Sequence, residues 1–185
     1  MRFVCTFLAL TAVVVGIATG SRALAAKTAV EATPIPASVK PDFSKMMLGK
    51  WNCSVMSSRR PGPYFITSTS MISPDGYWLI TQGNIHKTSW STALTSQDRV
   101  TYDPSTKQWI DLNYDTTGGY GVTTSSGWNG NNIVWTAVLA PKSASVATTN
   151  PTTITRVNAT RFTSIGSFTE TSGRLITVKT TCTKG

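Results

Sequence analysis

The stretch Leu48-Gly49-Lys50-Trp51-Asn52-Cys53 marks the point at which the sequence changes into a series of short β-strands. Residues 26–44, before it, are rich in Ala, Thr, Val and Pro, whereas β-branched residues recur at alternate positions after it. Alternation with a period of two is typical of strands that bury one face. The stretch itself combines a glycine, a cysteine and a tryptophan of the kind that proteins usually bury. We therefore predict that it begins the first strand of a β-domain covering residues 45–185.

Turn signals divide the rest of the chain. Pro74-Asp75-Gly76, Asp103-Pro104, Thr117-Gly118-Gly119, Asn129-Gly130 and Ser172-Gly173 are combinations that favour tight turns, because proline presets one dihedral and glycine accepts a positive φ. The predicted strands cover residues 48–56, 64–72, 77–85, 90–94, 99–102, 108–114, 120–125, 133–139, 153–158, 162–169 and 174–182, and residues 140–151 form a polar loop. Parallel strands need long crossovers, so these short connections predict an antiparallel meander.

Two cysteines lie at opposite ends of this meander. Cys53 shares a predicted strand face with Trp51, and Cys182 shares one with Ile176 and Val178. A disulfide requires α-carbons within about 7 Å, which a closed barrel provides and an open sheet of ten strands does not. We predict an all-β fold, an antiparallel up-and-down β-barrel of about ten strands closed by a Cys53–Cys182 disulfide. An immunoglobulin-type sandwich is the alternative, although its cysteines are closer in sequence and its strands fewer.

The first 25 residues are predicted to be a signal peptide. Arg2 precedes an apolar run over residues 3–18, and Ala23-Leu24-Ala25 places small residues where a signal peptidase cleaves. The run is shorter than the roughly 20 residues of a transmembrane helix, so we predict no stable membrane span. Cleavage after Ala25 removes Cys5 and leaves two cysteines in an oxidising compartment, where they form a disulfide. We expect a secreted or periplasmic protein with a flexible linker over residues 26–44.

The charge pattern argues against a polyanion partner. The formal net charge is +9, and removing residues 1–25 lowers it to +7. The basic residues are scattered singly, with Arg59-Arg60 the one adjacent pair, and this pattern favours a solvated surface. No nucleic-acid-binding motif is present, so no nucleic-acid partner is predicted. With one histidine and no closely spaced Cys or His pair, the sequence also predicts no metal site.

Gly49-Lys50-Trp51 resembles the Gly-x-Trp signature that begins the first strand of lipocalins and other calycins. The segments Val100-Thr101-Tyr102-Asp103-Pro104 and Gly127-Trp128-Asn129-Gly130 are similar to those of small lipocalin-like domains in bacterial exported proteins. The resemblance covers about residues 48–182 and implies a lipocalin-like barrel, but no activity. It also implies that Trp51 packs against a basic residue of the last strand. Arg174 is the nearest candidate, and Lys179 and Lys184 are the others.

Two other barrel families were compared on their site residues. Avidin-type barrels also begin with Gly-x-Trp, but their polar ligand-binding residues are not matched here. Nitrobindin-like barrels of ten strands bind haem through a histidine on a late strand, whereas His86 lies in mid-chain. We therefore predict no haem and no other cofactor.

The six tryptophans suggest either a packed core or an aromatic pocket. A barrel of ten strands is wide enough to leave a cavity unless large side chains fill it. We predict a ligand site formed by Trp78, Trp109 and Trp135, with Asp111 as a polar group on its wall. The expected function is binding of a small apolar or aromatic molecule. A filled barrel that acts through its surface on an envelope component is the alternative.

An enzyme is the third hypothesis. His86 and Asp111 are its candidate residues, but no nucleophile motif or paired carboxylates at a suitable spacing accompany them. The prediction is that the protein is not an enzyme.

Overall fold

A computed structural model describes residues 46–139 and 146–185, and most of them form strands. The strands are β1 Gly49–Ser57, β2 Tyr64–Ile72, β3 Leu79–Ile85, β4 Leu94–Asp103, β5 Gln108–Asp115, β6 Tyr120–Ser125, β7 Trp128–Asn129, β8 Asn132–Leu139, β9 Val146–Thr149, β10 Thr152–Asn158, β11 Arg161–Glu170 and β12 Leu175–Lys184. The predicted signal peptide and linker lie outside the described residues. In the described part, no helix has the length and apolar character needed to cross a membrane.

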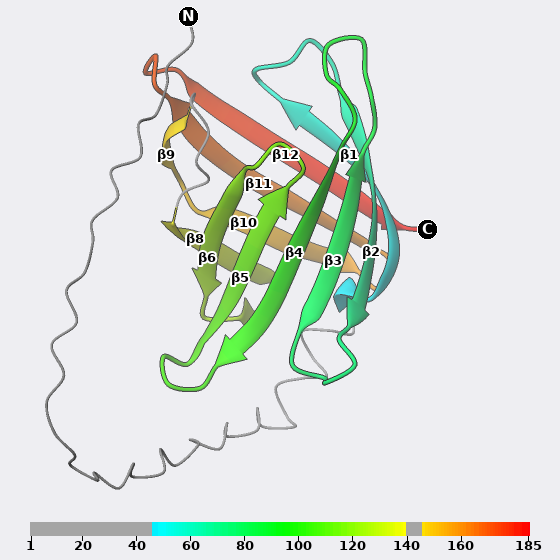
Figure 1. Cartoon of the computed structure of the whole chain (residues 1–185), viewed down its shortest axis with the longest axis vertical. Coiled ribbons are helices and arrows are strands. Elements are labelled where there is room, and N and C mark those ends of the chain that lie inside the picture. Colours follow the sequence, from blue (N-terminus) through cyan, green and yellow to red (C-terminus); the bar gives the residue numbers. More distant parts are fainter. Residues whose placement is uncertain (1–45, 140–145) are drawn as a thin grey trace, which may run out of the picture. The chain divides into compact units, whose positions relative to one another are not determined.

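Ten of these strands form a closed antiparallel ring (Figure 1). Consecutive strands pair from β1 to β6, β6 pairs with β8, and β10 pairs with both β8 and β11. β12 then lies between β11 and β1, so the last strand closes on the first. Two short strands are not members of the ring: β7 pairs with β8, and β9 pairs with β11. The predicted up-and-down barrel is confirmed.

The strands differ from the sequence prediction in two segments. One long strand, β4, takes the place of the predicted strands at 90–94 and 99–102. Trp90 is not part of β4. It lies in the short segment between Thr88 and Ser91, which form an isolated β-bridge. Residues Ser96 and Asp98 of β4 face the barrel interior, where alternation predicts apolar side chains. Because these inward residues are polar, the sequence pattern did not predict one continuous strand over residues 94–103. Strand β9 lies within the segment predicted to be a loop.

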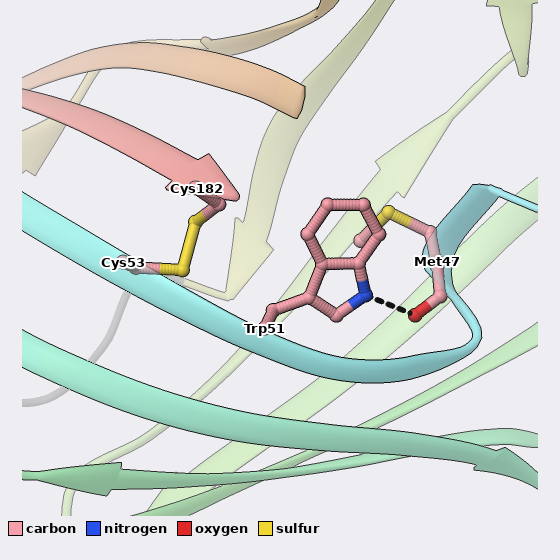
Figure 2. Close-up of a disulfide and its surroundings, with 4 residues drawn as sticks. All are labelled: Met47, Trp51, Cys53 and Cys182. Carbon is pink, nitrogen blue, oxygen red and sulfur yellow. Dashed lines mark hydrogen bonds between the residues drawn. A yellow bond between two sulfur atoms is a disulfide. The ribbon is translucent and has the colours of Figure 1, made fainter. Parts of the chain in front are cut away.

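The predicted disulfide joins the first strand to the last. Cys53 lies directly opposite Cys182 in the β1–β12 register, with their α-carbons 4.0 Å apart and the sulfur atoms at bonding distance. Figure 2 shows the bridge spanning the two strands beside the Trp51 indole. Both cysteines are buried, and they share a core cluster with Trp51 and Phe162. The disulfide therefore fixes the point where the ring closes.

Trp51 occupies the position that the Gly-x-Trp resemblance implies. Its indole Nε1 donates a hydrogen bond of 2.9 Å to the Met47 carbonyl, which Figure 2 also shows. The Phe162 ring packs edge-on against the indole, with centroids 5.0 Å apart. Lys184 Nζ lies 5.5 Å from the indole centroid, so Lys184 is the basic residue of the last strand in contact with Trp51. Arg174 instead forms an ion pair of 3.0 Å with Glu170.

Replacing Trp51 with Phe is expected to lower the free energy of unfolding by about 2 kcal/mol. The smaller ring leaves the Met47 carbonyl without its donor and loses packing against Phe162, and each effect costs about 1 kcal/mol. Urea denaturation at constant pH measures the change. Trp78→Phe is the matched control, because Trp78 is half-buried and lies outside the core clusters. Equal losses in the two variants would contradict this role for Trp51.

A cavity inside the barrel as the candidate functional site

The interior of the barrel holds a cavity of about 300 Å³. Its wall is formed by strands β3, β4, β5, β6, β8 and β10, together with Met47 and with Trp128 of β7. The lining residues occupy alternate positions of their strands, as expected for side chains that point inward. They are Met47, Leu79, Thr81, Asp98, Val100, Asp111, Thr123, Trp128, Ile133, Trp135, Thr152 and Ile154.

Most of this wall is apolar. Leu79, Val100, Ile133 and Trp135 are all less than 9 % exposed and form one core cluster. Met47 packs against this cluster and also against the cluster around the disulfide. The hydrogen bond from the Trp51 indole to the Met47 carbonyl positions Met47, just before β1, in the cavity wall. The result is a pocket with one large aromatic wall and several branched aliphatic side chains.

Two carboxyl groups interrupt the apolar wall. Asp98 on β4 and Asp111 on β5 come from adjacent strands and both line the cavity. Thr123 Oγ1 donates a hydrogen bond of 3.3 Å to Asp111 Oδ2. The other oxygen, Asp111 Oδ1, has less than 1 Å² of exposed surface and no hydrogen-bond partner among the described residues. A buried carboxylate oxygen without a donor is costly, so this pair of acids needs an explanation.

The two acids are harder to ionise than ordinary aspartates. Burial and, to a smaller extent, the negative charge of Asp111 together raise the pKa of Asp98 to about 7. Burial also raises the pKa of Asp111, to about 6, although the neighbouring side chains of Thr123 and Asn113 act in the opposite direction. The two groups titrate as a pair, so near neutral pH they retain part of their protons.

The residues predicted for the site have different positions. Trp135 and Asp111 lie in the cavity wall. Trp109 is half-buried beside the cavity, where it packs against the core cluster and meets the Tyr102 ring edge-on at 5.4 Å. Trp78 does not line the cavity. It precedes β3, whose first residue, Leu79, is the one that points inward.

Asp98 and Trp128 are lining residues that the sequence did not predict. Asp98 was missed because its strand was missed. Trp128 belongs to the motif Gly127-Trp128-Asn129-Gly130, which indicated the fold but did not indicate a binding site. Gly127 has a φ of +98°, and a side chain there would come within 3.2 Å of Trp109 Nε1. The turn therefore needs glycine for both its dihedral and its space.

A second, smaller pocket of about 230 Å³ lies toward the Ser57 end of β1. Arg60 lies over the Trp90 ring at 5.0 Å from its centroid, and Tyr64 meets the same ring edge-on at 5.9 Å. Arg59 forms an ion pair of 3.1 Å with Glu170. This pocket differs in charge from the interior cavity, because the interior cavity contains acidic groups and this pocket contains arginines.

His86, one of the enzyme candidates, is remote from the cavity. Its side chain is exposed, and its Nε2 lies 3.3 Å from Thr67 Oγ1. It does not line the cavity that contains Asp111, the other candidate. The structure does not bring the two proposed catalytic groups together.

Comparison with known proteins bears on the fold alone. The sequence matches no protein-family model and no curated protein. The structure is similar to the crystal structure of Rv2717c from M. tuberculosis, with a TM-score of 0.53 and 11% sequence identity, over 75% of this chain and 92% of that one. At that identity, the similarity shows a shared barrel architecture.

Proposed function

We propose that this protein binds a small apolar or aromatic molecule inside its barrel, without catalysing a reaction on it. The observation that carries the proposal is the cavity of about 300 Å³ lined by Trp135, Trp128 and branched aliphatic residues. Sites for small molecules begin at about this volume, and they combine apolar walls with a few polar groups. A ligand with one or two rings matches the space.

The chemistry of the wall favours such a ligand over water. A buried water needs two to four polar partners, and most of this wall has none to give. An apolar ligand gains free energy by removing its own surface and that of Trp135 from water. The alternative, a filled barrel that acts through its surface, does not use this cavity.

We also propose that the protein works outside the cytoplasm, either secreted or in the periplasm. The predicted signal peptide and the Cys53–Cys182 pair support this location, because structural disulfides persist mainly in oxidising compartments. The mass of the protein purified from cells tests it directly. Cleavage after Ala25 and a deficit of two hydrogens are the expected results. A chain that retains residues 1–25 would contradict the predicted cleavage.

Filling the cavity is expected to abolish binding. Val100→Phe adds a ring to the inner wall, whereas Val134→Phe makes the same change at an exposed position of β8. N-phenyl-1-naphthylamine is a suitable neutral dye, since its fluorescence rises in apolar surroundings. We expect Val100→Phe to weaken dye binding by about tenfold or more, equivalent to about 1.4 kcal/mol, and Val134→Phe to leave it unchanged.

Native mass spectrometry of the oxidised protein completes the test. A reproducible extra mass that is lost on denaturation would identify the natural ligand. If the protein binds neither dye nor natural ligand, the proposed function is wrong and the surface-acting module is favoured. Equal effects of the two valine variants would place the dye outside the cavity.

A further inference from the structure

The wall of the cavity has an unbalanced charge. Asp98 and Asp111 both line it, and none of the other lining residues is Lys, Arg or His. Elsewhere in the described residues the buried Glu170 has two arginines as partners, Arg59 at 3.1 Å and Arg174 at 3.0 Å. Among the described residues, one buried acid is therefore neutralised by two arginines, whereas neither cavity acid forms an ion pair.

We propose that the cavity is specific for small apolar amines and that Asp98 and Asp111 together hold the protonated amino group. This assignment rests on the proposed function, because it names the chemical class of the ligand for the same cavity. A primary ammonium group has three N–H donors and no acceptor. It supplies a positive charge and a donor for Asp111 Oδ1, which has no hydrogen-bond partner among the described residues.

The hydrogen bonds around Asp111 support an external donor. Thr123 already donates to Oδ2, so Oδ1 is the oxygen left for a ligand. Asp98 lies across from Thr81 on β3 and Asn113 on β5, at a diagonal to Asp111. Diagonal neighbours on adjacent strands lie about 7–8 Å apart, so one ammonium group placed between the two side chains reaches both carboxylates.

The apolar part of the wall specifies the rest of the ligand. Trp135 and Ile133 face the same cavity as the two acids and give an aromatic or aliphatic body a surface to pack against. Tryptophan rings also attract cations across their faces. A carboxylate ligand would be repelled by the acids, and a neutral ligand would leave Oδ1 without a charged partner. Cationic and apolar character in one small molecule satisfies both parts of the wall.

Three test compounds of similar shape separate charge from apolar binding: 2-phenylethylamine, 2-phenylethanol and 3-phenylpropionate. Their affinities are measured at neutral pH by displacement of N-phenyl-1-naphthylamine. We expect the amine to bind about tenfold or more tighter than the alcohol, and the propionate to bind most weakly. Asp111→Asn and Asp98→Asn should each reduce the preference for the amine and leave alcohol binding in place. Asp103→Asn, at the end of β4 where the carboxylate accepts a hydrogen bond from Ser105 N in the following turn, is the matched control and should keep the preference.

Each other result has a definite meaning. If amine and alcohol bind equally well, or if no compound displaces bound dye, the amine assignment is wrong while the proposed function stands. If the dye does not bind and native mass spectrometry finds no natural ligand, the proposed function is wrong as well. A preference for the amine that is lost equally in Asp103→Asn would also overturn the assignment. Near-UV circular dichroism shows whether each variant is folded. If either Asp98→Asn or Asp111→Asn does not fold, the other variant still tests the assignment.

Discussion

Reduction of the Cys53–Cys182 disulfide is expected to lower the free energy of unfolding by about 5 kcal/mol. The two cysteines are 129 residues apart, so the intact bond restricts nearly the whole of the described chain when it unfolds. In the chain-entropy account, closing a loop of this length removes enough freedom from the unfolded state to stabilise the folded one by that amount. A small domain has a total stability of about 5–15 kcal/mol, so the reduced protein should be close to unfolding.

Guanidinium denaturation of oxidised and reduced protein measures this difference. Both cysteines are buried, so reduction is carried out in denaturant before refolding. The Cys53→Ala/Cys182→Ala double variant is the control, and it should match the reduced protein in stability and not respond to reductant. A difference of less than about 1 kcal/mol between the oxidised and reduced proteins would contradict the entropic role of this long loop.

The second large effect expected is a loss of stability between pH 4 and pH 7. Unfolded aspartate has a pKa near 3.9, whereas the pKa values of Asp98 and Asp111 in the folded barrel are raised to about 7 and about 6. Below pH 4 the two acids are protonated in both states, and their contribution to stability is greatest. As pH rises, the unfolded chain releases its protons first, so unfolding becomes more favourable until the folded groups also ionise.

The size of this effect follows from the larger pKa rise. At about 1.4 kcal/mol per unit, raising one carboxyl pKa from 3.8 to about 7 corresponds to about 4 kcal/mol, and we expect the coupled pair to lose about that much together. Urea denaturation at a series of pH values measures the loss. The Asp98→Asn/Asp111→Asn double variant should show a much flatter profile over the same range.

Exposed carboxyl groups affect a different part of the pH range. Hydrogen bonds from Ser105 and Thr106 lower the pKa of Asp103, and hydrogen bonds from Thr117 and Gly119 contribute to a lower pKa for Asp115. These two groups favour the folded state above pH 4 and lose that contribution below it. A wild-type protein whose stability is constant or rises from pH 4 to pH 7 would show that the cavity acids are not buried as described.

The sequence predicted the barrel because its signals are local. Alternation of side chains, turn residues and the positions of Cys53 and Cys182 are each readable without knowing which strands are neighbours. Strand β4 was the exception, since its inward residues Ser96 and Asp98 are polar. Ser96 fits closely against Gly83 on β3, because a Cβ added at Gly83 would lie 2.8 Å from the Ser96 Oγ. Such reciprocal fitting across two strands is invisible in one sequence.

The same limit explains why only some of the predicted site residues line the cavity. Trp135 shares its face with Ile133, and both are buried, so the alternation of β8 identified the inward side. In β3 the inward face carries Leu79, Thr81 and Gly83, which is less apolar than a typical core face. Trp78 lies just before this strand and does not line the cavity, and the sequence carried no strong apolar pattern on the inward face that would have excluded it. The pairing of Asp98 with Asp111 depends on the β4–β5 register, which only the folded structure gives.

The contact between first and last strands has a consequence for how the chain folds. Strand β1 finds one of its two partners, β12, only after the intervening residues have been made. At 5–20 residues per second, a ribosome takes about 10 s to synthesise them. During that interval one edge of β1 presents unpaired backbone groups, which are a template for aggregation. The outward residues Asn52 and Ser54 of β1 are polar, so β1 is less prone to pair with other chains before β12 is available.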